Sequence, residues 1–537
     1  MKGVVTTPQP WAAEVGAQVL EAGGNAFDAA VASAFMQWVW DPFMCGPAGM
    51  GVGQVFHAAT GEHKVIDFNA RAGSKVRSDM WAGDVKSRTE VSHLFVFDDW
   101  RNEVGHTSVM TPGSVAAMAE INRRWGTMPW GELLQPAIQQ ARAGIPVHPT
   151  LHDWFIMPPF AGQPDALQRI KATDECARVF LKKDGTLPRF GDVIGMSDMA
   201  NTLDALARKG PREFYEGDLA RAMADDILKN GGFVTYDDLS AYTPRIQEPL
   251  WGTYRDNRVA TVRPSHSGMT LLQLFALVEP FELWKKQHGS ADMLHVVAAA
   301  MSLAHRDRLE HNADPEFADV PVEKILSKKH IGEQRQRIRE WRKGGTGAGV
   351  EAGHTTNVCA TDEQGNMVAL THTLGWASGA VTPGLGFVYN NSMNLADPTP
   401  GRPNSIAPGK SRGSNMIPSM VFKDGKPFLA VGALGGAVII SAVFQVMQNV
   451  LDFGMTLTEA TAAPRIHCEG GKVFAEARLR SDVETALEAK GHSVSREVFA
   501  YSPIQARSQA VMRRDDGSFD AGSDPRAGGG GVAYSQR

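Results

Sequence analysis

The sequence predicts an α+β fold, in which helices and strands occupy different stretches of one 537-residue chain. Residues 114–329 follow a mostly helical pattern. Residues 355–373 instead carry two short runs of β-branched and small residues around a polar turn, and strand-like runs return in the C-terminal third. With 43% hydrophobic and 21% charged residues, the composition is that of a globular protein that can bury a large core.

The N-terminal segment predicts two helices followed by a β-hairpin. Gly23 and Gly24 end the first helical run, and Asp41 and Pro42 end the second. The expected helices cover residues 10–20 and 28–40, and the expected strands cover residues 54–57 and 64–68. The glycine-rich stretch at residues 45–53 lacks the Lys-Ser/Thr ending of a P-loop and the spacing of a dinucleotide fingerprint. We therefore expect a turn that allows tight backbone packing, not a phosphate site.

The C-terminal third predicts strands around one long helix. The expected strands cover residues 420–422, 428–431 and 471–475, and the helix covers residues 439–453. Before them, residues 334–342 form a charged helical run, which is typical of a solvated face.

The most informative stretch is residues 344–361, where a glycine-rich segment runs directly into a strand. The glycines predict a mobile loop, and the strand begins with Thr355 and Thr356. Cleavage between His354 and Thr355 would give Thr355 a free amine with a pKa near ~8, which can accept the proton of its own hydroxyl. From this stretch alone an ordinary edge strand is the more common explanation, because threonine pairs are frequent in strands.

A wider set of motifs resembles one enzyme family along nearly the whole chain. In chain order the motifs are Gly23 to Ala32, Pro112 to Val115, Gly210-Pro211, Asn230 to Gly232, Ala313 to Pro315, Thr355-Thr356, Asn390 to Met393, Ser414 to Ser419, Gly435-Gly436 and Ala463 to Arg465. As a set they resemble the γ-glutamyltransferases. The resemblance implies a four-layer αββα sandwich of the N-terminal-nucleophile (Ntn) hydrolases, made as a proenzyme.

The resemblance also implies two subunits. Self-cleavage at His354–Thr355 would give a large subunit, residues 1–354, and a small catalytic subunit, residues 355–537, which together form one intertwined body. The products would remain an αβ heterodimer, and a dimer of such heterodimers is left open.

The family resemblance implies a catalytic role for four residues. Thr355 would be the nucleophile that forms an acyl-enzyme, and Thr373 matches the threonine whose hydroxyl hydrogen-bonds the nucleophile. Gly435 and Gly436 match the oxyanion-hole glycines, where the missing Cβ lets backbone N–H groups approach the substrate. The alternatives are an ordinary strand threonine for Thr373 and a plain turn before a helix for the glycine pair.

The residues expected to hold the substrate carboxylate depart from the family pattern. Asn69 stands where the family has a carboxylate-binding arginine. Arg71 lies two residues further on, and strand alternation would place it on the same face. Ser414 and Asn415 replace the family's serine pair and remain able to hydrogen-bond.

The residues expected around the substrate amino group depart as well. Gly375, Ser392 and Leu395 stand where the family has polar or acidic groups. Each charge-assisted contact that is lost is worth about 1.5–3 kcal/mol, so a γ-glutamyl head should bind weakly. Only residues 405–407 remain where many relatives have a lid loop, which predicts an open site.

These departures predict a self-processing amidohydrolase that cleaves a small acyl amide other than a γ-glutamyl one. A true γ-glutamyltransferase or glutathione hydrolase that uses Arg71, and an uncleaved binding protein of the same fold, are the alternatives. The expected partners are a small-molecule amide and the chain's own cleavage product. We expect no cofactor and no metal, because the histidines show no metal-ligand spacing.

Charge and composition argue against several other classes. A net charge of −5 without a basic run gives no indication of nucleic-acid binding, and no window of about 20 apolar residues predicts a membrane span. The scattered cysteines, Cys45, Cys176, Cys359 and Cys468, are expected to be free thiols. The first residues lack the apolar core of a signal peptide, which predicts a cytoplasmic protein.

Two polar residues near the motifs are predicted to be structural. His372 alternates with Thr371 and Thr373 and should point to the opposite face of the strand. Arg465 matches a family position where we expect a buried ion pair and no catalytic role.

Overall fold

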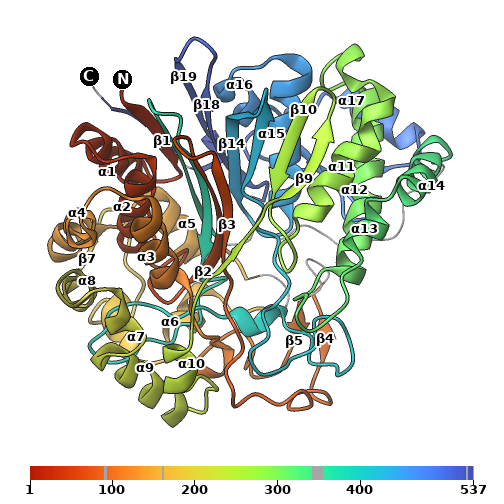
Figure 1. Cartoon of the computed structure of the whole chain (residues 1–537). Coiled ribbons are helices and arrows are strands. Elements are labelled where there is room, and N and C mark those ends of the chain that lie inside the picture. Colours follow the sequence, from red (N-terminus) through yellow and green to blue (C-terminus); the bar gives the residue numbers. More distant parts are fainter. Residues whose placement is uncertain (90–93, 160–161, 342–354, 503, 528–529, 536–537) are drawn as a thin grey trace.

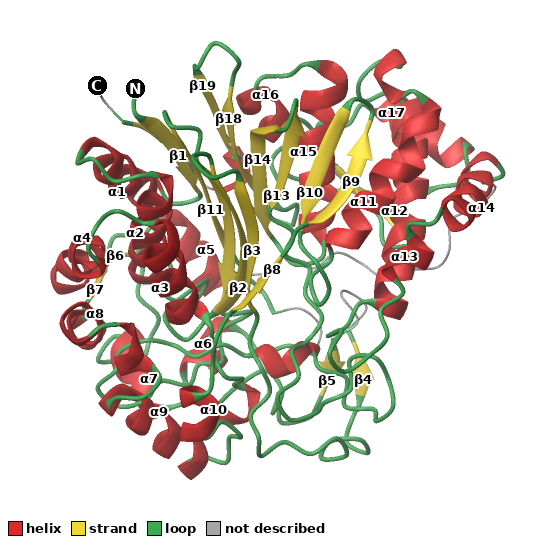
Figure 2. Ribbon diagram, in the orientation of Figure 1, coloured by secondary structure: helices red, strands yellow, loops and turns green. Residues whose placement is uncertain are grey.

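The computed structural model describes the chain except residues 90–93, 160–161, 342–354, 503, 528–529 and 536–537. Two β-sheets lie face to face (Figure 1), and helices cover the outer face of each sheet (Figure 2). This four-layer αββα arrangement confirms the predicted α+β fold. Of the helices that the described residues form, none has the length and apolarity required to cross a membrane.

The first sheet carries the predicted hairpin at its centre. Within the described residues its strands follow the order β20-β1-β11-β12-β2-β3-β8, and neighbouring strands are antiparallel. The strands are β1 (Gly3–Thr7), β2 (Met50–His57), β3 (Glu62–Phe68), β8 (Arg245–Gln247), β11 (Thr356–Asp362), β12 (Met367–Thr373) and β20 (Gly531–Tyr534). The terminal strands β1 and β20 therefore extend the sheet beyond β11.

The second sheet packs against the first. Its described strands follow the order β19-β18-β14-β13-β10-β9 and are also antiparallel. They are β9 (Leu250–Tyr254), β10 (Asn257–Thr261), β13 (Ser419–Lys423), β14 (Lys426–Leu434), β18 (Arg507–Arg513) and β19 (Phe519–Ser523). The core between the sheets includes buried Val4, Phe56, Cys359, Met367, Ala369, Met420, Ala430 and Val511. Strands β11 and β12 face β14 and β18 across this core.

The outer layers are helical. Helices α1 (Pro10–Glu21), α2 (Ala26–Trp40) and α3 (Ser114–Trp125) lie on the first sheet, and α4 (Trp130–Ala143) and α8 (Ser197–Lys209) pack behind α2. Helices α11 (Gly268–Val278) and α15 (Val438–Phe453) lie on the second sheet, with α12 (Ala291–His311) behind α11. The other helices are α5 (Pro149–Ile156), α6 (Ala166–Ile170), α7 (Asp174–Phe180), α9 (Asp218–Lys229), α10 (Tyr236–Ser240), α13 (Val322–Ile325), α14 (Lys328–Arg339), α16 (Leu457–Ala462) and α17 (Ser481–Ala489).

Short strands complete the described elements. They are β4 (Ser87–Arg88), β5 (Phe95–Val96), β6 (Ile145–Pro146), β7 (Val193–Ile194), β15 (Ile466–His467), β16 (Lys472–Ala475) and β17 (Ser493–Arg496). All four cysteines are buried free thiols.

Two sequence expectations need correction. The helical pattern predicted for residues 114–329 is interrupted by strands β8, β9 and β10 at residues 245–261. The glycine-rich stretch is not a turn throughout, because Met50 begins strand β2. Its tight packing is confirmed, since a Cβ on Gly51 would clash with the carbonyl of Thr371 on the neighbouring strand.

A buried charge cluster fixes the C-terminal segment and confirms the structural role predicted for Arg465. Its guanidinium pairs with Asp524, and Arg526 pairs with Asp524 at 2.8 Å and with Glu476 at 2.5 Å. Burial by itself would raise the pKa of Asp524, but the two arginines bring that pKa below its ordinary value. The cluster therefore keeps its charges paired inside the protein.

Candidate functional site

The hairpin of β11 and β12 brings the two predicted threonines together. Thr356 pairs with His372 in the antiparallel register, so Thr355 and Thr373 lie opposite each other just beyond that pair. The Oγ1 of Thr355 donates to the Oγ1 of Thr373 at 3.4 Å, and both residues are buried. This distance is longer than the usual 2.7–2.8 Å of a hydroxyl hydrogen bond, so the contact is weak in this state.

Strand alternation decides which layer each neighbouring side chain faces. Thr356 points toward the helical layer, where its Oγ1 accepts from the amide of Gln37 on α2 at 2.7 Å. His372 lies 2.9 Å from the same glutamine, which confirms that it points away from Thr373. Burial lowers the pKa of His372 to about 3, so the ring is neutral at physiological pH. Thr355 faces the opposite way, with Cys359 of the core between the sheets.

The turn after β12 is built around the Thr373 hydroxyl. Its Oγ1 accepts the N–H of Gly375 at 2.8 Å. Gly375 has a φ of +77°, and a Cβ at this position would clash with the Oδ1 of Asn391. That oxygen already accepts the N–H of Trp376 at 2.8 Å. A larger residue at Gly375, such as the asparagine of the family pattern, therefore does not fit this turn without a rearrangement.

The predicted oxyanion glycines lie between strand β14 and helix α15. Gly435 and Gly436 have φ values of +137° and +69°, a region that favours glycine. A Cβ on Gly435 would lie 2.9 Å from the Cα of Ala506, so this glycine is packed against a neighbouring segment. Gly436 instead lines the same pocket as Thr355. The adjoining N-terminus of α15 adds a partial positive charge, which suits an oxyanion.

The nucleophile pocket is lined by Leu94, Thr355, Thr373, Gly375, Trp376, Asn394, Leu395, Arg412, Ser414, Asn415, Met416, Gly436 and Ile439. Its empty volume is about 520 Å³, including the part open to solvent. The structure thus brings Thr355, Thr373, Gly375, Gly436 and the Ser414-Asn415 pair together, as the sequence predicted. Their individual roles remain predictions. His354 and the glycine-rich residues before it lie outside the described residues.

Three residues predicted to contact substrate point elsewhere. The Nη2 of Arg71 donates to the carbonyl of Thr243 at 2.9 Å, and its guanidinium lies 4.8 Å from the centre of the Tyr242 ring. The alternation argument failed for Arg71 because strand β3 already ends at Phe68, and Arg71 itself forms only isolated bridges.

Asn69 and Ser392 also have partners inside the protein. The amide of Asn69 donates to the Oγ of Ser265 at 3.0 Å and to the carbonyl of Arg412 at 2.9 Å. The Oγ of Ser392 lies 2.9 Å from the Sδ of Met50. Neither residue is among the described residues that line the nucleophile pocket, so their contact with substrate stays a prediction.

Sequence reasoning missed Arg412, which is the one charged residue among the described residues of the pocket lining. Its exposed fraction is 6%. Burial lowers its pKa to about 10, and the carboxylate of Glu103 partly offsets that effect. The sequence signal was an arginine two residues before the Ser414-Asn415 pair.

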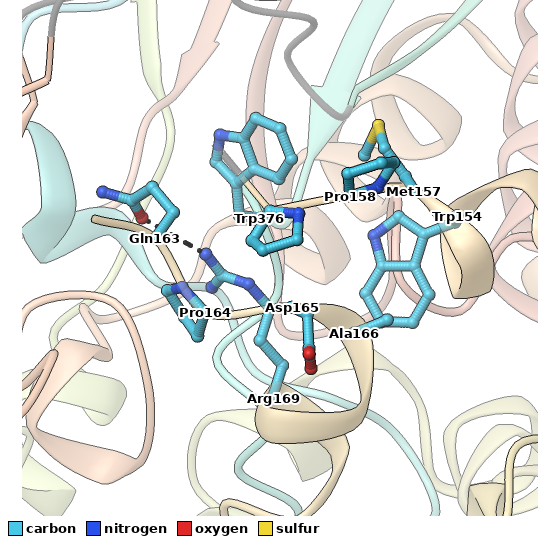
Figure 3. A pocket seen from close by; sticks show the side chains of 10 residues that line it. Trp154, Met157, Pro158, Gln163, Pro164, Asp165, Ala166, Arg169 and Trp376 are labelled. Atoms are coloured by element: carbon cyan, nitrogen blue, oxygen red, sulfur yellow. Dashed lines mark hydrogen bonds between the residues drawn. The ribbon is translucent and has the colours of Figure 1, made fainter. Parts of the chain in front are cut away.

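A second hollow adjoins the site through Trp376, which lines both (Figure 3). Its walls include Trp154, Pro158 and Pro164, together with Arg169. The guanidinium of Arg169 bonds the carboxylate of Glu103 at 3.1 Å and approaches Gln163 at 3.5 Å. This hollow is mostly apolar and contains no nucleophile among its described lining residues.

A third pocket adjoins the nucleophile pocket. The two share Leu94, Asn394, Leu395 and Asn415. The third pocket has an empty volume of about 760 Å³ and is more polar, with Arg88, Asp397 and Arg308 among its other lining residues. The two pockets therefore adjoin each other, and Thr355 lines the smaller one.

Comparisons with known proteins agree with this geometry. The family model described as Gamma-glutamyltranspeptidase matches residues 12–534. The chain is 35% identical to "Acylase ACY 1 proenzyme" of Pseudomonas sp. (strain V22), over 99% of this chain and 94% of the relative. It is 32% identical to "Glutathione hydrolase proenzyme" of Escherichia coli (strain K12), over 98% and 90%. The cephalosporin acylase structure from Bacillus halodurans superposes with a TM-score of 0.89 at 29% identity, covering 100% of this chain and 96% of the other.

Proposed function

This chain belongs to the γ-glutamyltranspeptidase family and is a self-processing amidohydrolase of the Ntn class, and we propose that it cleaves small acyl amides other than γ-glutamyl ones. The observation that carries this proposal is the charge of the nucleophile pocket. Its described lining contains one cation, Arg412, and no acidic side chain. A γ-glutamyl head carries both a carboxylate and an ammonium, and the ammonium would enter this pocket without a counter-ion.

We assign the chemistry to the residues that share the pocket. After cleavage before Thr355, its free amine takes the proton of the Thr355 hydroxyl as Oγ1 attacks the amide carbonyl. The N–H of Gly436 and the N-terminus of α15 stabilise the oxyanion. The amine of the substrate then leaves with a proton, and water hydrolyses the acyl-enzyme to the free acid. Thr373 holds the Oγ1 of Thr355 in position.

We assign the two connected pockets to the two halves of the substrate. The acyl group occupies the smaller pocket beside Thr373 and Trp376, and the departing amine occupies the more polar pocket beyond Asn394 and Leu395. The relatives named acylase and cephalosporin acylase support an acyl group other than γ-glutamyl.

A γ-glutamyltransferase or glutathione hydrolase activity is the second candidate. It is favoured by the similarity to the glutathione hydrolase proenzyme of Escherichia coli. It would need another residue in the place of the missing arginine, and the guanidinium of Arg71 is engaged with Thr243 and Tyr242.

A matched pair of chromogenic amides separates the two candidates. γ-Glutamyl-p-nitroanilide and glutaryl-p-nitroanilide have the same chain and the same terminal carboxylate, and they differ only in the α-ammonium. We expect kcat/KM for the glutaryl compound to be roughly 10 to 150 times higher, which is the value of one charge-assisted contact. Thr355→Ala should cleave neither compound. A clear preference of the wild type for the γ-glutamyl compound would refute the proposal in favour of the second candidate.

A further inference from the structure

We propose that Arg412 binds a carboxylate at the far end of the acyl group, so that the substrates are monoamides of dicarboxylic acids. This inference rests on the proposed function and adds the acyl class to it. Arg412 and Thr355 line one pocket, which places both beside a substrate bound there. The substrate would place its amide carbonyl at Thr355 and its free carboxylate at the guanidinium.

The guanidinium of Arg412 is buried and forms no ion pair with a carboxylate of the described residues. Among the described residues, Nη1 donates to the carbonyl of the adjacent Gly413 at 3.0 Å, Nη2 lies 3.7 Å from the Sδ of Met50, and Nε has no partner. A guanidinium has five N–H donors, so this side chain keeps unused hydrogen-bonding capacity. Leaving such a cation buried is costly unless a partner arrives.

The nearest acid, Glu103, is engaged through one of its two carboxylate oxygens, Oε2. The carboxylate of Glu103 accepts from Arg169 at 3.1 Å and from the amide of Asn391 at 2.8 Å. Glu103 and the two arginines therefore leave a net positive charge beside the pocket. An incoming carboxylate would neutralise that charge and could accept two N–H groups of the planar fork.

The backbone of Arg412 is fixed on both sides, which makes it a prepared site. Its carbonyl accepts from the amide of Asn69 at 2.9 Å. The N–H of Ser411 donates to Asp314 at 2.9 Å, and the N–H of Gly413 donates to Asn404 at 3.1 Å. Asn69, which stands at the position of the family arginine, thus supports the segment that carries the new cation.

A purely structural role for Arg412, as a second counter-ion of Glu103, makes a different prediction. In that case removing Arg412 would change stability but would not change the choice between charged and neutral acyl groups. Substrate selectivity is therefore the readout that separates the two roles.

The test uses glutaryl-p-nitroanilide and pentanoyl-p-nitroanilide. Their acyl chains differ only at the far end, which is a carboxylate in the first compound and a methyl group in the second. We expect the wild type to prefer the glutaryl compound. Arg412→Met should lower kcat/KM for that compound roughly 10- to 150-fold and leave the pentanoyl value essentially unchanged. Arg412→Lys should restore part of the loss, because it keeps the charge without the fork. Arg71→Met is the matched control, because it removes a guanidinium outside the pocket and should keep the wild-type preference.

Equal losses on both compounds, or a preserved glutaryl preference in Arg412→Met, would overturn the assignment. If Arg412→Met does not fold, inhibition of the wild type by the two product acids tests the carboxylate site instead. Glutarate should inhibit at lower concentration than pentanoate, and equal inhibition would overturn the proposal. If the processed wild type cleaves no amide at all, the proposed function fails. The carboxylate site is then tested by the unfolding temperature, which should rise with glutarate and should not rise with pentanoate.

Discussion

Replacing Thr373 with valine removes a hydroxyl at the centre of the site while keeping the side-chain shape. The Oγ1 of Thr373 accepts from the N–H of Gly375 at 2.8 Å and from the Oγ1 of Thr355 at 3.4 Å. Valine has nearly the same volume, so no cavity forms and both effects come from the lost acceptor. Thr373→Ser is the matched control, because it keeps the hydroxyl and loses only a methyl group.

The size of each effect follows from the two distances. The Gly375 N–H would be left unsatisfied in a mostly buried turn, which costs about 1–3 kcal/mol of unfolding free energy. The longer bond to Thr355 is weaker, and a net value of about 1 kcal/mol corresponds to a roughly fivefold to tenfold loss of kcat. We expect Thr373→Ser to lose much less of both stability and rate.

Denaturant unfolding and turnover of the glutaryl amide measure these two effects on the same preparations. The extent of processing, read on a denaturing gel, ensures that the variants are compared as cleaved enzymes. If Thr373→Val matched Thr373→Ser in both the unfolding midpoint and kcat, Thr373 would be an ordinary strand threonine.

Two further predictions concern the oxyanion site and acid stability. Gly436→Ala should lower kcat about 10²-fold, because the added Cβ crowds the tetrahedral intermediate and strains a backbone with a φ of +69°. Full activity would place the oxyanion donors elsewhere. Burial lowers the pKa of both His63 and His372 to about 3. The unfolded chain therefore binds their protons first, and the unfolding free energy should fall from about pH 6.5 toward pH 3 by up to about 1.4 kcal/mol per unit per histidine. His372→Gln should reduce the pH dependence of the unfolding free energy between pH 7 and pH 5. An unchanged pH dependence would contradict the lowered pKa of His372.

The hairpin at the site was predictable because its pattern is local. Strand β11 begins one residue later than expected, at Thr356, and β12 ends at Thr373, the last residue of the predicted stretch 355–373. Strand β1 was missed for a physical reason. It is buried on both faces, so its residues show no polar alternation, and its partners β11 and β20 lie hundreds of residues away in the sequence.

The sequence predicted most of the residues that meet in the pocket, including Ser414 and Asn415, but it did not predict Arg412. Thr355, Thr373 and Gly436 follow from motifs whose backbone geometry is set within a few residues. The segment that carries Arg412 is held instead by the distant Asn69, whose amide donates to the Arg412 carbonyl. Arg71 was assigned to the pocket only by extending strand β3 past its end. Such long-range support leaves no periodic signal in the sequence.

N-terminal sequencing of the purified protein tests the central claim most directly. The purified protein should give two fragments, one of which begins at Thr355 and reads Thr-Thr-Asn-Val. Thr355→Ala should remain a single chain without amidase activity, because both the cleavage and the reaction require the Thr355 hydroxyl. A wild-type protein that remains one intact chain and still hydrolyses acyl amides would contradict the N-terminal threonine mechanism.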